Sequence, residues 1–536
     1  MPDYIIIGGG SAGCVLAARL SEDPAVQVAL LEAGPSDSSV LIHCPAGLAA
    51  LAKNNQVNWA FSTVPQAGLN GRRGYQPRGK VLGGSSSVNA MVYVRGQRED
   101  YDAWAAQGNP GWGFADVLPY FRRSEHNERR ELQGDAFHGT GGPLNVMDLR
   151  SPNRYAQVFV EAAQQAGFPA NSDFNAADQE GVGLYQVTHK NGERYSAARA
   201  YLTPHLGRPN LQVITGAHTT RILMEGRRAV GVEFRQAGQL KQLKASREVL
   251  LCAGALQSPQ VLMLSGIGPA AELARHGIPL VHDLPGVGEN LHDHIDVVQV
   301  VHAPRMKDLF GLTLAGAWRV VKGVFEWRGK RSGMLTTNFA EAGGFIRSSP
   351  AQATPDLQLH FVIGKLVDHG RKTVFGLGYS CHVCLLNPKS RGRLTLASGD
   401  PLAAPLIDPN FLAERDDMDR MVRGFKLMRN ILSQPALAGY LGEELPSTGN
   451  ARTDAEIEQV IRNYGDTIYH PAGTCRMGNG PMDVVDPQLR VHGIDGLRVV
   501  DASIMPTLVS GNTNAPVIMI AEKAADMIRS PASPRS

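Results

Sequence analysis

The sequence predicts an α/β protein with a Rossmann-like dinucleotide-binding domain and a second domain built on an antiparallel sheet. The chain opens with an apolar run at residues 4–7, a glycine-rich turn at 8–13 and an apolar helix at 14–20. A second apolar run at 26–31 ends at an acid, Glu32, which completes the strand, helix and strand order of a parallel sheet. Far along the chain, apolar and polar residues alternate at 357–361 and 379–383, a pattern typical of half-buried strands.

Length and charge limit the function classes. A chain of 536 residues is too long to fold around one hydrophobic core, so two or more domains are expected. The net charge of +3 gives no electrostatic footprint for nucleic acid. No apolar run approaches the roughly 20 residues that span a bilayer. Without a secretory signal or a disulfide framework among six cysteines, we expect a cytoplasmic location, with contact at the inner face of the membrane left open.

The glycine-rich turn is the first motif that carries chemistry. Residues 8–13 read Gly-Gly-Gly-Ser-Ala-Gly, which matches G-x-G-x-x-G. Gly8 permits the tight turn, Gly10 lets the backbone approach a pyrophosphate, and Gly13 lets helix and strand pack closely. The amides of the helix N-terminus then face the phosphate charge. Glu32 follows at the distance where an acid binds ribose hydroxyls, which argues against NADP but does not separate NAD from FAD.

Further motifs follow in a fixed order along the chain. Residues 78–89 read Arg-Gly-Lys-Val-Leu-Gly-Gly-Ser-Ser-Ser-Val-Asn, and residues 254–269 hold Gly-Ala-Leu-Gln-Ser-Pro-Gln and Ser-Gly-Ile-Gly-Pro. Residues 470–478 read His-Pro-Ala-Gly-Thr-Cys-Arg-Met-Gly, and residues 511–516 read Gly-Asn-Thr-Asn-Ala-Pro. Together with the turn at 8–13, these motifs resemble the glucose–methanol–choline (GMC) oxidoreductases over nearly the full chain. The runs 338–345 and 388–392 resemble the choline dehydrogenase and bacterial FAD-dependent alcohol dehydrogenase branch.

This resemblance implies FAD as the cofactor and a discontinuous cofactor domain. Residues 1–300 would form the FAD-binding domain with flavin-capping excursions, and 301–480 the substrate-binding domain. Residues 481–536 would return a strand, 497–500, to the FAD sheet and end in a Ser/Pro-rich tail at 530–536. An amphipathic helix is expected over 416–432, where a methionine stripe at helical spacing predicts packing rather than a ligand site.

The resemblance also implies the residues that contact FAD. Choline oxidases link FAD covalently through a histidine that precedes the asparagine of the first signature; here Val88 precedes Asn89, so non-covalent FAD is expected. The expected cofactor contacts are Gly8, Gly10, Ser11, Ala12, Gly13, Glu32, Ala33, Val81, Gly83, Gly84, Ser85, Asn89, Met91, Val92, Thr219, Asp501, Ala502, Asn512 and Thr513.

The predicted chemistry is the oxidation of a primary alcohol to the aldehyde, with hydride transfer to flavin N5. His470 is the candidate base because imidazole titrates near neutral pH. The resemblance places a second His or Asn opposite it, assigned here to Asn514, whose amide would donate to the developing alkoxide. A helix expected over 515–527 would direct its positive end at the flavin. Glu341 matches a position that lines the substrate pocket in the choline branch, although a structural hydrogen-bonding role is the alternative.

Several other interpretations compete with this one. Cys381 and Cys384 match C-x-x-C, but no second ligand pair stands at zinc spacing. Residues 292–296 read His-Asp-His-Ile-Asp, and three of them would share one strand face. The preceding run 286–291 resembles a structural segment of the family, whose members need no metal, so no metal is expected. The Ser-rich run at 84–87 lacks the G-x-S-x-G spacing of a serine hydrolase. The electrons are expected to pass to a non-oxygen acceptor such as a quinone. The alternatives are a choline dehydrogenase, an oxygen-dependent alcohol oxidase, a catalytically silent flavin-binding protein and an NAD-dependent dehydrogenase.

Overall fold

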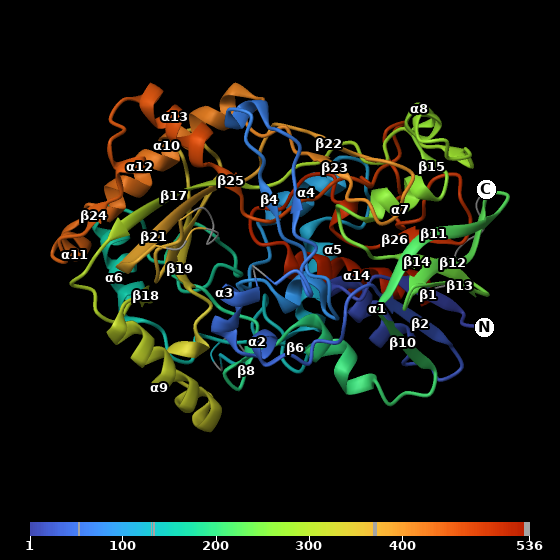
Figure 1. Cartoon of the computed structure of the whole chain (residues 1–536), viewed down its shortest axis with the longest axis horizontal. Helices are drawn as coiled ribbons and strands as arrows, with labels where there is room; N and C mark the ends of the chain where they lie inside the picture. The colour runs from blue at the N-terminus through green and yellow to red at the C-terminus, as the bar shows by residue number, and fades with distance from the viewer. Residues whose placement is uncertain (52–53, 130, 132–133, 368–371, 373, 530–536) are drawn as a thin grey trace.

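A five-stranded parallel sheet lies at the centre of the N-terminal body (Figure 1). The computed structural model describes residues 1–536 except 52–53, 130, 132–133, 368–371, 373 and 530–536, so the predicted tail lies outside the described residues. The strands follow the spatial order β10 (Leu211–Thr215), β2 (Val28–Glu32), β1 (Tyr4–Ile7), β14 (Glu248–Leu251) and β26 (Leu497–Val499). Every pairing in this sheet is parallel.

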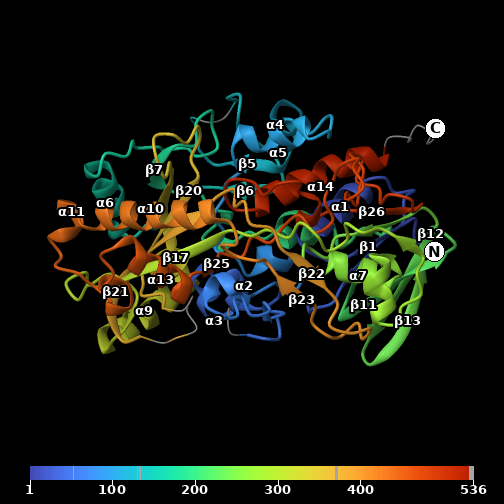
Figure 2. The same cartoon turned by 90° about the horizontal axis from the view of Figure 1, so that it is seen from above.

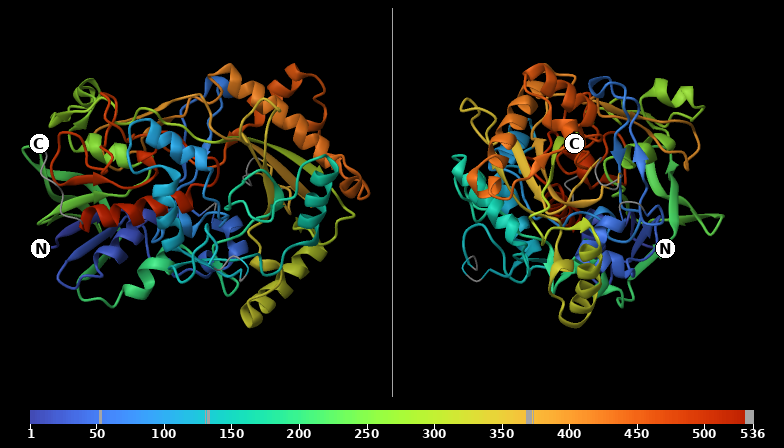
Figure 3. Two further views of the ribbon diagram at one scale, coloured as in Figure 1. Left: turned by 180° about the vertical axis from the view of Figure 1, so that it is seen from behind. Right: turned by 60° about the vertical axis from the view of Figure 1, so that its left-hand side comes forward.

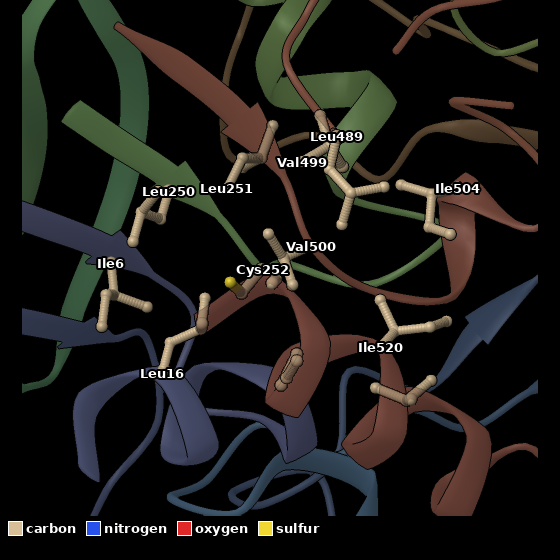
Figure 4. Close-up of a cluster of buried hydrophobic side chains, with 14 of the residues drawn as sticks. Ile6, Leu16, Leu250, Leu251, Cys252, Leu489, Val499, Val500, Ile504 and Ile520 are labelled. Carbon is tan, nitrogen blue, oxygen red and sulfur yellow. The ribbon is translucent and has the colours of Figure 1, made fainter. Parts of the chain in front are cut away.

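Two helices from opposite ends of the chain cover one face of this sheet. Helix α1 (Ser11–Leu20) begins within the glycine-rich turn, three residues earlier than expected, and packs against α14 (Asn514–Arg529). Figure 4 shows Leu16 of α1 close to Ile6 and Cys252, and Ile520 of α14 on the other side of the same cluster, below Ile504. All four residues of β1 are buried, which explains why the strand is apolar throughout rather than alternating. The C-terminal strand and helix thus complete the core that the N-terminus begins.

An antiparallel sheet of eight strands forms the second body. Its main order is β24 (Glu443–Glu444), β17 (Ile295–His302), β21 (Gly376–Leu385), β20 (Leu357–Val362), β19 (Ala340–Ile346) and β7 (Gly181–Leu184). Two short strands pair outside this order, β18 (Gly311–Leu312) with β21 and β25 (Asp466–Thr467) with β17. Helices α6 (Arg154–Gln165) and α10 (Arg415–Leu432) pack on one face, as Figure 2 shows from above. The methionine stripe of α10 is buried in this core, as predicted.

The alternating strands are buried on both faces, and the expectation of half-buried strands is therefore wrong. Leu359 and Phe361 of β20 pack in the core beneath α6 and α10. The polar residues between them do not face solvent, because the N-terminal body covers that side of the sheet. His360 and His382 of this inner face line a large cavity between the two bodies. The alternation of apolar and polar residues on β20 and β21 therefore places apolar side chains in the core and polar side chains toward the cavity.

The fold class agrees with the prediction, while the boundaries of the predicted domains stay a prediction. Helix α6 and strand β7 belong in sequence to the 1–300 segment, yet they pack with the antiparallel sheet. Strand β26 lies in the 481–536 segment and pairs with β14 of the parallel sheet. The chain therefore passes between the two bodies more often than a simple division suggests.

Helix α9 (Leu314–Lys330) projects from the lower edge of the antiparallel body, as Figure 1 and both views of Figure 3 show. Among the described residues, no helix combines the length and the apolar content needed to cross a membrane.

Candidate active site

A cavity of about 1150 Å³ lies between the parallel sheet and the antiparallel sheet. Its first half is formed where β1, β2 and β14 end, the usual place for a ligand in a sheet of this kind. Its second half is walled by β20, β21 and the segment around His470. The predicted residues that line it are Gly8, Gly10, Ser11, Ala12, Glu32, Ala33, Gly84, Ser85, Asn89, Met91, Val92, Thr219, His470, Asp501, Ala502, Asn512, Thr513 and Asn514.

Three predicted cofactor contacts do not line this cavity but shape its wall from behind. A Cβ atom on Gly13 would lie 1.9 Å from the carbonyl oxygen of Gly8, so only glycine allows α1 to pack this closely on the turn. The backbone N–H of Gly83 donates to the carbonyl of Gly9 at 2.7 Å. Val81 is fully buried in a small apolar cluster. These three residues support the wall, and their direct contact with FAD stays a prediction.

The first half of the cavity fits a dinucleotide. Helix α1 has no side-chain cap at its N-terminus, so its first amides lie open to a phosphate. A Cβ atom on Gly84 would lie 2.7 Å from the Cα of Gly10, so the two glycine-rich segments approach backbone to backbone. Glu32 accepts hydrogen bonds from the amides of Gly9 (2.9 Å) and Gly34 (2.7 Å), while its side chain faces the cavity. Burial raises the pKa of this carboxyl to about 7.

Backbone contacts of the segment around His470 hold this residue in the second half of the cavity. The preceding residue, Tyr469, has a φ of 76°, a left-handed conformation that is costly for a tyrosine. The guanidinium of Arg78 donates to the carbonyl of Tyr469 at 2.6 Å, and the amide of His470 donates to Asp293 at 2.8 Å. Ala472 exchanges two backbone hydrogen bonds with His292. These contacts fix where the imidazole enters the cavity.

The imidazole of His470 has a partner on each ring nitrogen. Its Nδ1 atom lies 3.0 Å from Nδ1 of His294, and its Nε2 atom lies 3.3 Å from the side-chain nitrogen of Asn512. Asn512 turns its nitrogen toward His470 because its oxygen accepts from Gln358 at 3.1 Å. Nε2 of His470 is therefore a hydrogen-bond acceptor, and Nδ1 carries the proton. Burial, followed by the neighbouring His294 and Arg78, lowers the pKa of His470 well below 6.5.

The geometry places Asn512, rather than Asn514, beside the imidazole of His470. The side-chain oxygen of Asn514 accepts from the hydroxyl of Ser11 at 2.8 Å, which joins the N-termini of α14 and α1. Asn512 takes the place beside the imidazole instead. Asn514 is the first residue of α14, whereas Asn512 lies two residues ahead of the helix and can reach across the cavity.

The structure does not bring Glu341 into the cavity. The Glu341 side chain is 1% exposed; its carboxylate accepts from the amide of Asn153 at 2.6 Å and from the hydroxyl of Thr337 at 2.5 Å. Burial raises its pKa to about 7. These contacts favour the structural alternative over a role in substrate binding.

Several cavity residues were missed in the sequence. The ring of His360 faces the cavity and is 4% exposed, and neither ring nitrogen has a hydrogen-bond partner among the described residues. Nδ1 of His382 lies 2.5 Å from the carboxylate of Asp296. Polar residues at alternate positions of β20 and β21, with the 292–296 run, were the available signal. That run supplies contacts to His470 and His382.

Within the described residues, no three His, Cys, Asp or Glu side chains are arranged to hold a metal ion. All six cysteines are buried as free thiols.

The comparisons with known proteins agree with the motif order. Two sequence models described as GMC oxidoreductase match residues 2–296 and 388–521. The chain is 51% identical to an alcohol dehydrogenase [acceptor] of Pseudomonas putida, over 98% of this chain and 96% of that protein. It is 47% identical to the mitochondrial choline dehydrogenase of Homo sapiens, over 98% of this chain and 89% of that protein.

Solved structures share the fold as well. An FAD-dependent oxidoreductase from Chaetomium thermophilum superimposes with a TM-score of 0.90 and 29% identity, over 99% of both chains. Matching models cover both ends of the chain, and the relatives match it over nearly its whole length. This chain therefore belongs to the GMC oxidoreductase family.

Proposed function

We propose that this protein is an FAD-dependent alcohol dehydrogenase that oxidises a primary alcohol to the aldehyde and passes the electrons to a non-oxygen acceptor such as a quinone. The observation that carries the proposal is the His470 and Asn512 pair, which lies in the same cavity as the glycine-rich turn. The similarity to the Pseudomonas putida alcohol dehydrogenase supports the choice of substrate class and acceptor.

FAD would be held by the amides of α1, by Glu32 and by the Gly84–Ser85 backbone. When bound, FAD supplies the two-electron acceptor that takes the hydride from the alcohol carbon. Val88 lines the cavity and has no nucleophilic atom, which supports non-covalent binding. Asn514 and Ser11 lie at the meeting point of two helix N-termini, whose positive ends would stabilise negative charge on the reduced cofactor.

Side chains of the protein would remove the hydroxyl proton of the alcohol. Neutral His470 would accept the hydroxyl proton at Nε2, since Nδ1 donates to His294. Asn512 would donate its N–H to the alcohol oxygen as negative charge develops there. Gln358 orients Asn512 for this role, because an amide that rotated would lose its contact with Gln358. Proton removal and hydride loss together balance the conversion of the alcohol to the aldehyde.

The cavity lining favours a neutral alcohol over choline. Among the described lining residues, the only carboxylates are Glu32 and Asp501, both at the ends of the parallel strands. The second half is lined by apolar side chains such as Phe310, Phe339 and Val362, with cations at Lys365 and Lys372. Among the described lining residues, a quaternary ammonium group would meet no carboxylate in this half.

An anaerobic screen of primary alcohols, with choline included, tests the proposal. Bleaching of the flavin by apolar alcohols and slow bleaching by choline are expected. No bleaching by any alcohol would leave a silent flavin-binding protein, and fast bleaching by choline would move the assignment to a choline dehydrogenase. Rapid turnover in air with stoichiometric peroxide would instead indicate an oxidase. The expected cytoplasmic location, with contact at the inner face of the membrane left open, stays a prediction.

A further inference from the structure

Helix α9 touches the body along one narrow face. Gly316, Gly323 and Trp327 are its only buried residues, and they share one side of the helix. The indole nitrogen of Trp327 donates to the carbonyl of Gly192 at 2.8 Å, and Arg319 donates to the carbonyl of Leu309 at 2.8 Å. The rest of the helix surface is free to meet another surface.

The side opposite this contact is apolar, the reverse of an ordinary surface helix. Leu314 (94% exposed), Trp318 (61%), Val321 (45%) and Phe325 (74%) lie at helical spacing on the outward side. We call these four residues the α9 stripe. Water contact with such a row of large side chains is unfavourable, so a contiguous exposed row marks a surface that meets an apolar phase or partner.

Cations flank the α9 stripe. The helix carries Arg319, Lys322, Arg328 and Lys330 and one acid, Glu326, a net charge of +3. The ammonium of Lys322 lies 5.6 Å from the ring of Trp318, beside the stripe rather than away from it. An apolar row bordered by Lys and Arg on one helix is the composition of helices that lie in the interface of an anionic bilayer.

The cavity opens next to the same surface. Leu312, Leu314 and Phe375 line the cavity, yet they are 52%, 94% and 76% exposed. Val320 of α9 also lines the cavity. Leu314 belongs both to the cavity lining and to the α9 stripe, so the two meet at this residue.

We propose that α9 docks the protein on an anionic lipid surface, with the α9 stripe in the acyl-chain boundary and the flanking cations at the headgroups. A second copy of the chain is disfavoured because two α9 helices packed stripe to stripe would bring Lys322 and Arg328 against their own copies. The consequence for the reaction rests on the proposed function. An apolar alcohol and a lipid-soluble acceptor would enter the cavity from the bilayer without crossing water.

Vesicle binding by the FAD-loaded protein tests the docking without any turnover. We expect sedimentation with vesicles of phosphatidylglycerol and phosphatidylcholine, weaker binding to phosphatidylcholine alone, and release by salt. Trp318→Glu/Phe325→Glu should lower the partition coefficient by more than about tenfold, because two apolar side chains are lost from the bilayer boundary. Lys322→Gln/Arg328→Gln should weaken binding to the anionic vesicles only.

The matched control is Leu206→Glu/Leu240→Glu, which changes two exposed leucines, at 51% and 58%, away from α9. This control should bind vesicles as the unchanged protein does. All these positions are exposed, and bound flavin absorbance with the far-ultraviolet circular dichroism spectrum checks that each variant is folded. Equal binding by the α9 variants and the control would overturn the proposal. So would a dimer in sedimentation velocity that only the α9 variants dissociate.

Fluorescence gives a second readout. The tryptophan emission of Trp318 is the difference between the unchanged protein and Trp318→Phe. Lipids with brominated acyl chains should quench this emission. If they do not, α9 lies outside the bilayer. If the protein binds vesicles but no alcohol bleaches its flavin, the proposed function is wrong and the docking proposal stands. If alcohols bleach the flavin but the protein does not bind vesicles, the docking proposal is wrong and the proposed function stands.

Discussion

The side-chain nitrogen of Asn512 lies 3.3 Å from Nε2 of His470, and Gln358 fixes that orientation from the opposite side of the amide. The two residues come from segments at 470–478 and 511–516 that meet only in the folded chain. One ring nitrogen of a neutral imidazole is thereby left as an acceptor, with an N–H donor next to it. This arrangement can take a proton from an alcohol and stabilise the oxygen that loses it.

Replacing Asn512 separates its role from that of Asn514. Asn512→Ala should keep FAD bound and slow its reduction by alcohol by about 10² to 10³-fold, the loss typical of one alkoxide donor. Asn514→Ala removes only the contact with Ser11 and should be much milder. Rapid anaerobic mixing with alcohol compares the two. A larger loss in Asn514→Ala would restore the sequence-based assignment.

The pH dependence follows from the lowered pKa of His470. The base acts in its neutral form, which is present above the folded-state pKa, and burial places that pKa well below 6.5. The limiting rate of flavin reduction should therefore be level from pH 6.5 upward and fall only at more acid pH, as the imidazole is protonated. A single ionisation above neutrality that vanished in His470→Ala would contradict the geometry.

Glu32 should contribute to cofactor affinity. Glu32→Ala removes a charged acceptor that faces the cavity, so FAD binding should weaken by about 1.5 to 3 kcal/mol. Glu32→Gln keeps the shape and one acceptor oxygen and should lose less. Equilibrium dialysis of the apoprotein with FAD measures both. Unchanged affinity in Glu32→Ala would show that Glu32 serves only the amides of Gly9 and Gly34.

The cofactor should leave the protein on denaturation. Val88 cannot form a bond to the flavin, so acid precipitation should give a colourless pellet and free FAD in the supernatant. The flavin absorbance of the pellet and of the supernatant measures how much FAD is released. Flavin retained on the pellet would require a covalent link at another residue.

The sequence predicted the cofactor half of the cavity better than the substrate half. Residues 8–13 are contiguous, and their roles are local. The spacing of the glycines predicts the tight turn, the close approach of the backbone to a phosphate and the start of the helix. The substrate half is assembled from β20, β21, 292–296 and 510–514, whose register no local pattern reveals. Asn512 and Asn514 differ by two positions, and only the start of α14 decides which of them reaches His470. Glu341 is a similar case, because the amide that donates to its carboxylate comes from Asn153, which precedes helix α6 and is distant in sequence.

The most direct test of the account is anaerobic stopped-flow reduction of the FAD-loaded His470→Ala variant by the best alcohol from the screen. The variant should bind FAD with an unchanged visible spectrum yet reduce it about 10² to 10⁴-fold more slowly than the unchanged protein, the range for loss of a general base. Near-normal reduction in His470→Ala would contradict the account and require another base in the cavity.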